Sequence, residues 1–466
     1  MWNELPLDQY RAQQDDSLRE WLSQEVIAYA PYWNIRLADL VIQDVDALRE
    51  VPAATEDDVA GRGGPGNPAL MLTPKEREVR QKAGLRDLFG RARHGTSVQA
   101  RRDALYHAYK PVHVHEAGVD NVLAIAWSSA DLERGLESGR DLAAVLGLHQ
   151  DDTLINLVPA GPTLDFWGIV HLGRGQRMAS LHLRGTGESV LAPARRGFGL
   201  LPASVVAVPT YEASLLIERL LDDGVKRPHI HVVLCVGEPP DEGLRAQLAT
   251  MSERIAGHPV RIQAVWGPAA GRVLYGEPPM AEDADPSEFH GLMTYGDKDI
   301  VGLRDPETGE PITQGPGELV ITSLGWAGTA LVQFATGTRV EAIIEGDPHP
   351  YSQSVAPRLV GTITEAAWQP LVSVAPPGIR PDSSTLERPD FRGIRTDIEE
   401  ALRLAQANEY ALSVIHQRLV IQVDRIDRPS IRIATAQIGK ICGVEPTIEV
   451  SHRLPSGPRR ILGGVL

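Results

Sequence analysis

Between residues 120 and 270, short apolar runs typical of strands alternate with longer stretches of helical periodicity, and this alternation restricts the possible folds more than any other feature. Strands and helices in alternation imply parallel strands joined by crossover helices. The expected strands are Val122–Trp127, Thr153–Pro159, Ser204–Val208, Ile230–Val236 and Arg261–Trp266. The expected helices cover about Ala130–Leu146, Tyr211–Asp222 and Asp241–Ile255. We therefore predict an α/β fold with a parallel sheet.

The segments before residue 120 and after residue 270 have different sequence patterns. Near the N-terminus, apolar residues at helical spacing from Leu18 to Tyr29 predict a helix that ends at Pro31. Thr55 precedes three acidic residues, a pattern typical of a helix N-cap. From about residue 290 short strands and turns predominate, including a hairpin-like turn at Asp305–Glu310.

Residues 361–466 predict a separate small α+β unit. Its expected elements are a helix at Asp397–Ala407, strands at Leu412–Ile415 and Leu419–Val423, and a helix near Pro429–Cys442. We therefore expect a first domain over residues 1–360 and a second over residues 361–466, with a hinge near Gly361.

The charge balance excludes a general nucleic-acid binder. The chain of 466 residues has 46 Lys and Arg against 61 Asp and Glu, a formal net charge of −15, whereas nucleic-acid binding requires a basic excess. No stretch approaches the roughly 20 apolar residues of a membrane helix, and the acidic start MWNELPLDQYRAQQDD is unlike a secretory signal. Only two cysteines occur, Cys235 and Cys442, which excludes a disulfide framework. We expect a cytoplasmic protein that binds neither nucleic acid nor membrane.

One segment departs from this acidic character. From Lys75 to Lys110, ten Lys and Arg accompany four Asp and Glu, and we interpret residues 60–110 as a basic insertion. The segment is either a patch for an anion or partner, or a solvated helical face, and the second alternative is the more typical.

Short motifs then occur in a recognisable order. They are Ala30-Pro31-Tyr32, Val208-Pro209-Thr210-Tyr211, Val236-Gly237-Glu238-Pro239, Asp305–Glu310, Gly317–Leu324, Asp397–Glu400 and Leu454–Gly457. This order resembles the adenylate-forming ligases, specifically the phenylacetate–coenzyme A ligase branch. The resemblance implies a large N-terminal domain with stacked mixed sheets, a small β-barrel-like subdomain at 290–355, and a C-terminal α+β lid.

The resemblance also implies an activity, in which ATP activates a carboxylate and the acyl group passes to the thiol of coenzyme A. ATP with magnesium and coenzyme A are therefore expected only if this ligase activity holds, and no cofactor follows from the residues alone. Fold does not by itself imply chemistry, so the groups that perform it are sought one by one.

The resemblance implies four groups that bind ATP or perform the chemistry. Two of them contact the phosphates, the adenine and the metal. The phosphate loop corresponds to His113–Asn121, which has one glycine and no hydroxyl, while Glu116 and Asp120 would repel a phosphate. The adenine and magnesium motif corresponds to Trp266-Gly267-Pro268-Ala269-Ala270. Trp266 could stack on a flat ring, but neither Ala269 nor Ala270 can bind a hard cation that requires oxygen ligands.

The other two groups are also replaced. Thr338 occupies the position of the aspartate that accepts the ribose hydroxyls, and Gln333 that of the preceding arginine. The family lysine should follow Gly457, but the next residues are Pro458 and Arg459. Arginine is rarely a neutral replacement for lysine, so the catalytic motifs are degenerate and the catalytic residues stay unknown.

The resemblance nevertheless implies where ligands would lie. The nucleotide-pocket candidates are Gly237, Glu238, Pro239, Trp266, Gly267 and Thr338, and the acyl-pocket candidates are Phe166, Trp167 and Tyr211. His113 and His115 alternate with Val112 and Val114. This spacing suits a metal pair, but we prefer a half-buried strand with its polar residues on the other face, and we predict no metal site. His229 and His231 are interpreted in the same way.

Three hypotheses on function follow. The chain is a divergent ligase with weak or lost carboxylate activation, or a non-catalytic binding or regulatory subunit that keeps a pocket for a small carboxylic acid or nucleotide, or an enzyme of altered chemistry. An active acyl- or aryl-coenzyme A ligase that uses replacement residues stays open within the first hypothesis. We also expect a homodimer, with Trp21, Tyr29 and Trp33 as exposed aromatic anchors, and allow for a protein partner.

Overall fold

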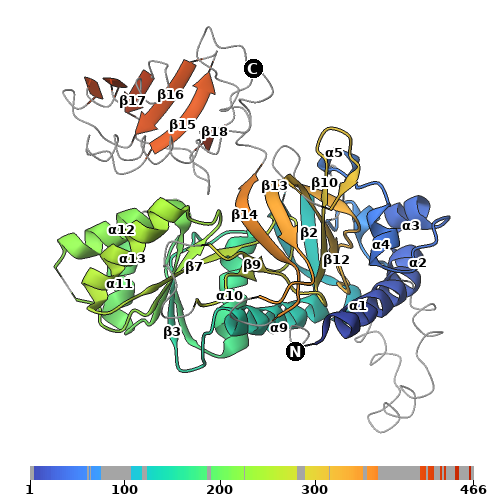
Figure 1. Cartoon of the computed structure of the whole chain (residues 1–466), viewed down its shortest axis with the longest axis horizontal. Helices are drawn as coiled ribbons and strands as arrows, with labels where there is room; N and C mark the ends of the chain where they lie inside the picture. The colour runs from blue at the N-terminus through green and yellow to red at the C-terminus, as the bar shows by residue number, and fades with distance from the viewer. Residues whose placement is uncertain are drawn as a thin grey trace.

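One mixed sheet of twelve strands organises the structure, in the order β11-β10-β12-β13-β14-β9-β8-β7-β6-β5-β3-β4 (Figure 1). The computed structural model describes residues 5–59, 62, 64–74, 107–117, 123–185, 190–224, 226–280, 289–313, 315–349, 354–365, 410–415, 418–423, 431–432, 435–436, 447–450 and 461–462. The predicted helix at Asp397–Ala407 and most of the basic insertion lie outside these residues.

The parallel half of the sheet confirms the predicted alternation. Its strands are β3 (Thr153–Asn156), β4 (Ala179–His182), β5 (Val205–Pro209), β6 (Val232–Val236) and β7 (Arg261–Trp266), and every pairing among these five strands is parallel. Its helices are α9 (Ser129–Val145), α10 (Leu164–Gln176), α11 (Leu191–Leu200), α12 (Thr210–Asp222) and α13 (Glu242–Ala256). The predicted strands and helices are confirmed to within a few residues, whereas α10, α11 and β4 were not predicted. The expected strand Val122–Trp127 is the exception to the parallel sheet, because it forms β2 (Leu123–Ser128), which pairs antiparallel with β1 (Pro111–Ala117) in a separate two-stranded sheet.

Strands β5 and β6 are apolar throughout because both of their faces are covered. Val205 and Ala207 pack into one hydrophobic core, while Val206 and Val208 pack into a second core together with α11, α12 and α13. Side chains alternate between the two faces of a strand, and a continuous apolar run is what a doubly covered parallel strand requires.

Helices α9 and α10 approach each other through glycines. A Cβ atom on Gly139 would collide with the carbonyl of His171, and one on Gly175 would collide with the carbonyl of Leu136. Helix α9 begins with a capping box in which Ser128 and Asp131 each accept a hydrogen bond from the other's backbone N–H.

The N-terminal helices differ from the prediction at Pro31. Helix α1 (Leu7–Trp21) continues through a π-helical turn (Leu22–Val26) into α2 (Ile27–Tyr29), and the extended backbone of Ala30 separates α2 from α3 (Pro31–Leu37). Pro31 therefore begins a helix at its first position, where a missing N–H costs nothing. The predicted N-cap is confirmed, because Thr55 Oγ1 accepts a hydrogen bond from Asp58 N at 3.3 Å at the start of α5 (Glu56–Val59).

The prediction that Trp21, Tyr29 and Trp33 are exposed is wrong. Their exposed fractions are 6%, 7% and 1%. The indole of Trp33 donates to the carbonyl of Ala330 at 2.8 Å, and that of Trp21 to the carbonyl of Trp326 at 3.3 Å. These aromatic side chains thus attach the N-terminal helices to the rest of the same chain, and the predicted homodimer loses the surface on which it was based.

The β-rich segment continues the parallel sheet. Its strands are β8 (Tyr275–Gly276), β9 (Leu292–Met293), β10 (Asp299–Arg304), β11 (Pro311–Ile312), β12 (Gly317–Ser323), β13 (Phe334–Ile344) and β14 (Arg358–Glu365). They pair antiparallel, and β8 joins them to β7. The predicted turn is confirmed, since Asp305 N donates to the carbonyl of Glu310 at 2.8 Å.

Near the C-terminus, four strands form a separate sheet in the order β17-β16-β15-β18. They are β15 (Tyr410–Ile415), β16 (Arg418–Val423), β17 (Thr447–Val450) and β18 (Ile461–Leu462), so both predicted strands are confirmed. Gly361 lies inside β14 with a φ of 70°, and the boundary between two domains near it stays a prediction. None of the described helices is long and apolar enough to cross a membrane.

A buried ion pair holds α13 against the edge of β7. Arg245 and Glu277 are 0% and 1% exposed, their side chains are 2.9 Å apart, and Glu277 also accepts a hydrogen bond from Ala264 N. We expect Glu277→Ala to lower the free energy of unfolding by about 3–5 kcal/mol, because it leaves a buried guanidinium without its counter-charge.

Urea denaturation measures this effect. The matched control is Asp222→Ala, which removes the exposed pair with Arg219 and should cost less than about 1 kcal/mol. Equal losses in the two variants would contradict the prediction.

Candidate functional site

The carboxyl ends of the parallel strands form one edge of the sheet, the position where open α/β sheets bind ligands. β3 ends at Asn156, β4 at His182, β5 at Pro209, β6 at Val236 and β7 at Trp266. Because these strands are neighbours, the segments that follow them lie beside one another along this edge.

The loop after β6 carries three of the nucleotide-pocket candidates. Gly237 has a φ of 100°, a conformation that strongly favours glycine, and its N–H donates to the carbonyl of Val265 on β7 at 2.9 Å. Glu238 is half-buried, and Pro239 is buried. The structure thus brings this loop next to the segment that follows β7.

The segment after β7 is part of the core. Trp266 is 2% exposed, and its ring lies 6.3 Å from that of Tyr275. A Cβ atom on Gly267 would collide with the carbonyl of Val273, and Ala270 is 4% exposed. Trp266 therefore presents little free aromatic surface to a planar ligand at this edge.

Thr338 does not join these residues along the sheet. It lies on β13, and β14, β9 and β8 stand between β13 and β7. Its side chain is 3% exposed, and its backbone N–H donates to Thr336 Oγ1 at 3.2 Å. Gln333, in the position of the family arginine, has a φ of 44° and is 7% exposed.

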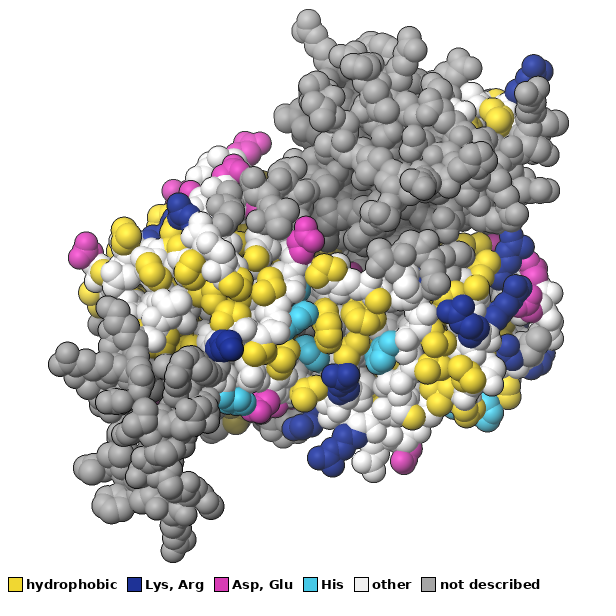
Figure 2. Space-filling model, turned by 180° about the vertical axis from the view of Figure 1, so that it is seen from behind, with side chains coloured by type: hydrophobic (Ala, Val, Ile, Leu, Met, Phe, Trp, Pro, Cys, Tyr) yellow, Lys and Arg dark blue, Asp and Glu magenta, His cyan; other side chains and the backbone are white. Residues whose placement is uncertain are grey.

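The histidines of β1 (Pro111–Ala117) face inward, opposite to the prediction. His115 is buried and His113 half-buried, whereas Val112 and Val114 are 51% and 36% exposed. β1 pairs antiparallel with β2 (Leu123–Ser128), and aromatic side chains cover its inner face. On the face of the molecule seen from behind, histidine side chains lie among hydrophobic ones (Figure 2).

A histidine–tryptophan cluster results from this orientation. It comprises His113, His115, His171, Trp127 and Trp167, with ring centroids 4.6 to 6.3 Å apart in the contacting pairs. The cluster joins the β1–β2 hairpin to α10. Rings in tilted and edge-to-face arrangements at these separations stabilise the fold by more than the burial of their apolar surface alone.

Within the cluster, His115 is a neutral link between two segments. Its Nδ1 accepts a hydrogen bond from the indole N–H of Trp127 at 2.7 Å, and its Nε2 lies 3.1 Å from the carbonyl of Ala269, which fixes the proton on Nε2. Burial, and then the charge of Arg272, lower the pKa of His115 to about 3. Because both ring nitrogens have partners, His115 is not available as a metal ligand.

Two members of the cluster, His113 and Trp167, and the neighbouring Phe166 are only half-buried. His113 Nε2 is buried without a hydrogen-bond partner among the described residues, and the ring of Trp167 lies 4.6 Å away. Phe166 contacts Trp167 and His182 at 5.7 and 6.1 Å. Phe166 and Trp167 are two of the acyl-pocket candidates. The third candidate, Tyr211, is on α12, and its side chain is outside the described part.

A buried ion pair at the same edge was not predicted from the sequence. Arg184 follows β4, and its guanidinium donates to both carboxylate oxygens of Glu212 in the first turn of α12. His182 accepts a hydrogen bond from the amide of Asn156 at 3.1 Å on Nδ1, and burial lowers its pKa. Glu212 directly follows the Val208–Tyr211 motif, which is the signal that could have identified it.

The remaining predicted positions lie outside the described residues, namely 118–121 of the phosphate loop and Pro458 with Arg459. Among the described residues, no group of three His, Cys, Asp or Glu side chains could hold a metal ion. His229 lies near the start of β6 with an exposed side chain, and His231 stacks on His258 at 4.8 Å, so neither is at the carboxyl edge.

The buried imidazoles predict a dependence of stability on pH. Burial lowers the pKa of His171 from 6.5 to about 4, so in this window the unfolded chain takes up a proton that the folded chain does not. The free energy of unfolding therefore falls as pH falls from 6.5 towards 4. We expect His171→Gln to reduce the slope by up to about 1.4 kcal/mol per pH unit.

Denaturation at several pH values between 7 and 4 tests this expectation. The exposed His149 provides the control, since its side chain is in water in both states, and His149→Gln should keep the wild-type slope. Identical slopes for His171→Gln and wild type would show that the buried imidazole of His171 does not cause the dependence of the free energy of unfolding on pH.

No protein-family model matches the chain, and no curated protein matches it in sequence. Among solved structures, 2-hydroxyisobutyryl-CoA ligase in the postadenylation state with 2-HIB-AMP has a TM-score of 0.67 at 12% identity, covering 99% of this chain and 91% of that one. The same ligase with R3-HIB-AMP gives 0.65 at 13% identity, with the same coverage. A similarity of this extent at such low identity concerns the fold, and it confirms the fold predicted from the order of motifs, whereas the phenylacetate–coenzyme A ligase branch stays a prediction. The chain has the fold of the adenylate-forming ligases.

Proposed function

We propose that this chain is a divergent relative of the phenylacetate–coenzyme A ligases in which ATP-dependent carboxylate activation is weak or lost and a small-molecule pocket is retained. The observation that carries the proposal is the burial of the segment after β7, where Trp266 and Ala270 are 2% and 4% exposed. In ligases with the same motif order, this segment would hold adenine and magnesium.

The donor set at this segment does not fit magnesium. Mg²⁺ requires oxygen ligands in octahedral geometry, and the motif position holds alanine. The nearby carbonyl of Ala269 already pairs with His115 Nε2 at 3.1 Å. Arg272, at the end of the segment, is 1% exposed and donates to the carbonyls of Ala126 and Thr329. These contacts favour a segment that serves packing, and its residues support no catalytic step through ATP.

The acyl side supports binding of a small carboxylic acid. Phe166 and Trp167 offer half-buried aromatic faces, and His113 Nε2 lacks a partner among the described residues. Burial lowers the pKa of His113, so the imidazole is neutral near pH 7. A neutral imidazole can donate one hydrogen bond to a carboxylate or accept one from a carboxylic acid. This chemistry suits recognition by a cytoplasmic binding or regulatory subunit.

The first expected outcome concerns catalysis. The chain should not exchange labelled pyrophosphate into ATP with any aryl or fatty acid at a ligase rate. Loss of a single electrostatic donor costs about 10²- to 10³-fold, and two independent losses would leave roughly 10⁻⁴ to 10⁻⁶ of the rate. An active adenylate-forming ligase assayed in parallel is the control. Turnover of about one per second, an ordinary enzyme rate, would instead establish an active ligase with replacement residues.

The second expected outcome concerns binding. Titration calorimetry with benzoate and phenylacetate should detect binding, and Trp167→Ala should weaken it about fivefold to tenfold by removing an aromatic contact. Trp167→Phe, which keeps a ring, should retain most of the affinity, provided that both variants melt as the wild type does. Equal affinities in all three proteins would place the ligand elsewhere.

A further inference from the structure

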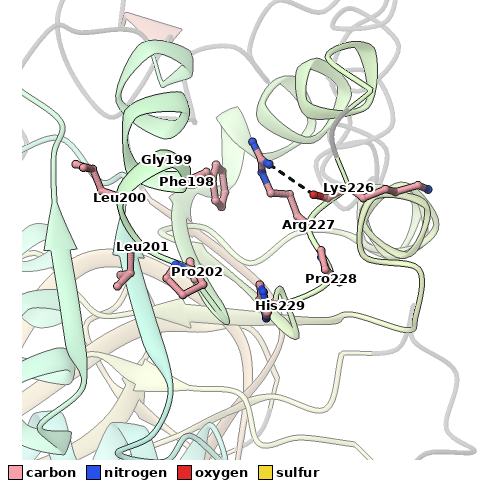
Figure 3. A pocket seen from close by; sticks show the side chains of 10 residues that line it. Phe198, Gly199, Leu200, Leu201, Pro202, Lys226, Arg227, Pro228 and His229 are labelled. Carbon is pink, nitrogen blue, oxygen red and sulfur yellow. Dashed lines mark hydrogen bonds between the residues drawn. The ribbon is translucent and has the colours of Figure 1, made fainter.

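A cavity of about 370 Å³ lies at the opposite edge of the sheet, away from the candidate site. It is bounded by the carboxyl end of α11, the segment that leads into β5, and the segment that leads into β6 (Figure 3). The residues that line it are Phe198, Gly199, Leu200, Leu201, Pro202, Ala203, Lys226, Arg227, Pro228 and His229. Its volume is in the range of about 300–1,000 Å³ that is typical of small-molecule pockets.

The lining combines an apolar wall with positive charge. Lys226 and Arg227 line the cavity, and none of its lining residues is acidic, although the chain as a whole has a net charge of −15. Leu200 at its rim is 71% exposed. This composition is what an organic anion with an apolar body would require.

Arg227 is the cation that faces the interior. Its guanidinium lies 5.1 Å from the ring centroid of Phe198, and its Nε is buried without a partner among the described residues. Figure 3 shows Arg227 and Phe198 facing each other, while the side chain of Lys226 points away. Lys226 Nζ donates instead to the carbonyl of Arg254 at 2.6 Å.

One acid that interacts with Arg227 is already paired with another arginine. Asp223 interacts with Arg227, but its two oxygens accept hydrogen bonds from Arg195 at 2.7 and 2.9 Å. The carboxyl end of α11 borders the cavity and adds a partial negative charge. One anionic group therefore suits the cavity better than several.

We propose that this cavity is a second binding site, separate from the carboxyl edge, for a small amphipathic molecule with one anionic group. Arg227 binds the anion, and Phe198, Leu201 and Pro202 contact the apolar body. A carboxylate and a phosphate monoester share the chemistry that Arg227 recognises, and the test distinguishes them.

Titration calorimetry of the full chain with octanoate, octyl phosphate and uncharged octanol, all below their micelle concentrations, tests the proposal. We expect the anions to bind more tightly than octanol. Arg227→Gln should weaken their binding about tenfold or more, because hydrogen bonds to charged groups are among the strongest, whereas Arg227→Lys should keep part of the affinity. The anion that binds with the higher affinity shows whether the site prefers a carboxylate or a phosphate monoester.

A steric variant tests the location without changing charge. A Cβ atom on Gly199 meets no atom within 4 Å, so Gly199→Phe can fill the cavity and should abolish binding while the melting temperature stays near that of wild type. Arg219→Gln, a surface charge change outside the lining, should leave binding unchanged. Failure of both anions to bind, equal binding of octanol, or binding that survives both Arg227→Gln and Gly199→Phe would overturn the proposal.

Discussion

The carboxylate of Asp131 connects the β1–β2 hairpin and the start of α9 to the β-rich segment, and the candidate site depends on this connection. It accepts backbone N–H groups from Ser128 at 2.9 Å, Ala327 at 2.8 Å and Gly328 at 2.7 Å. The first belongs to the start of α9 and the other two to the β-rich half. Because a buried carboxylate is stable only when its oxygens are hydrogen-bonded, this residue determines how the β1–β2 hairpin meets the second half of the sheet.

A chain of aromatic contacts extends from this anchor to the site. Trp127 and Trp326 lie 5.4 Å apart, and the guanidinium of Arg272 lies over both rings. Arg272 ends the segment that follows β7, and His115 holds the same segment through the carbonyl of Ala269. The segment that family resemblance assigns to adenine and magnesium is thus attached at two points to the protein's own interior.

The sequence predicted the features that local pattern encodes. The apolar runs of β5 and β6 need cover on both faces, and the N-cap of α5 needs the side chain of Thr55, so both were predictable. The orientation of His113 and His115 was not, because polarity placed the histidines outside. Burial of His115 is favourable because the indole of Trp127 and the carbonyl of Ala269 satisfy its ring nitrogens.

Helix α10 was missed because glycines weaken helix propensity, whereas here they allow close packing against α9. At the candidate site, the motifs named the adjacent loops after β6 and β7, but they also named Thr338, which lies on β13, and they did not indicate the Arg184–Glu212 pair, whose partners are far apart in sequence.

That close packing has a consequence for how such a protein could change its ligand during evolution. Where Gly139 and Gly175 bring the backbones of α9 and α10 together, any larger residue would collide with a main-chain carbonyl, and main chain cannot be repacked by a rotamer change. The separation of the two helices is therefore not adjustable by point mutation. New ligand shapes would have to arise from substitutions in the first turn of α10, at Phe166 and Trp167, where side chains rather than backbone form the wall.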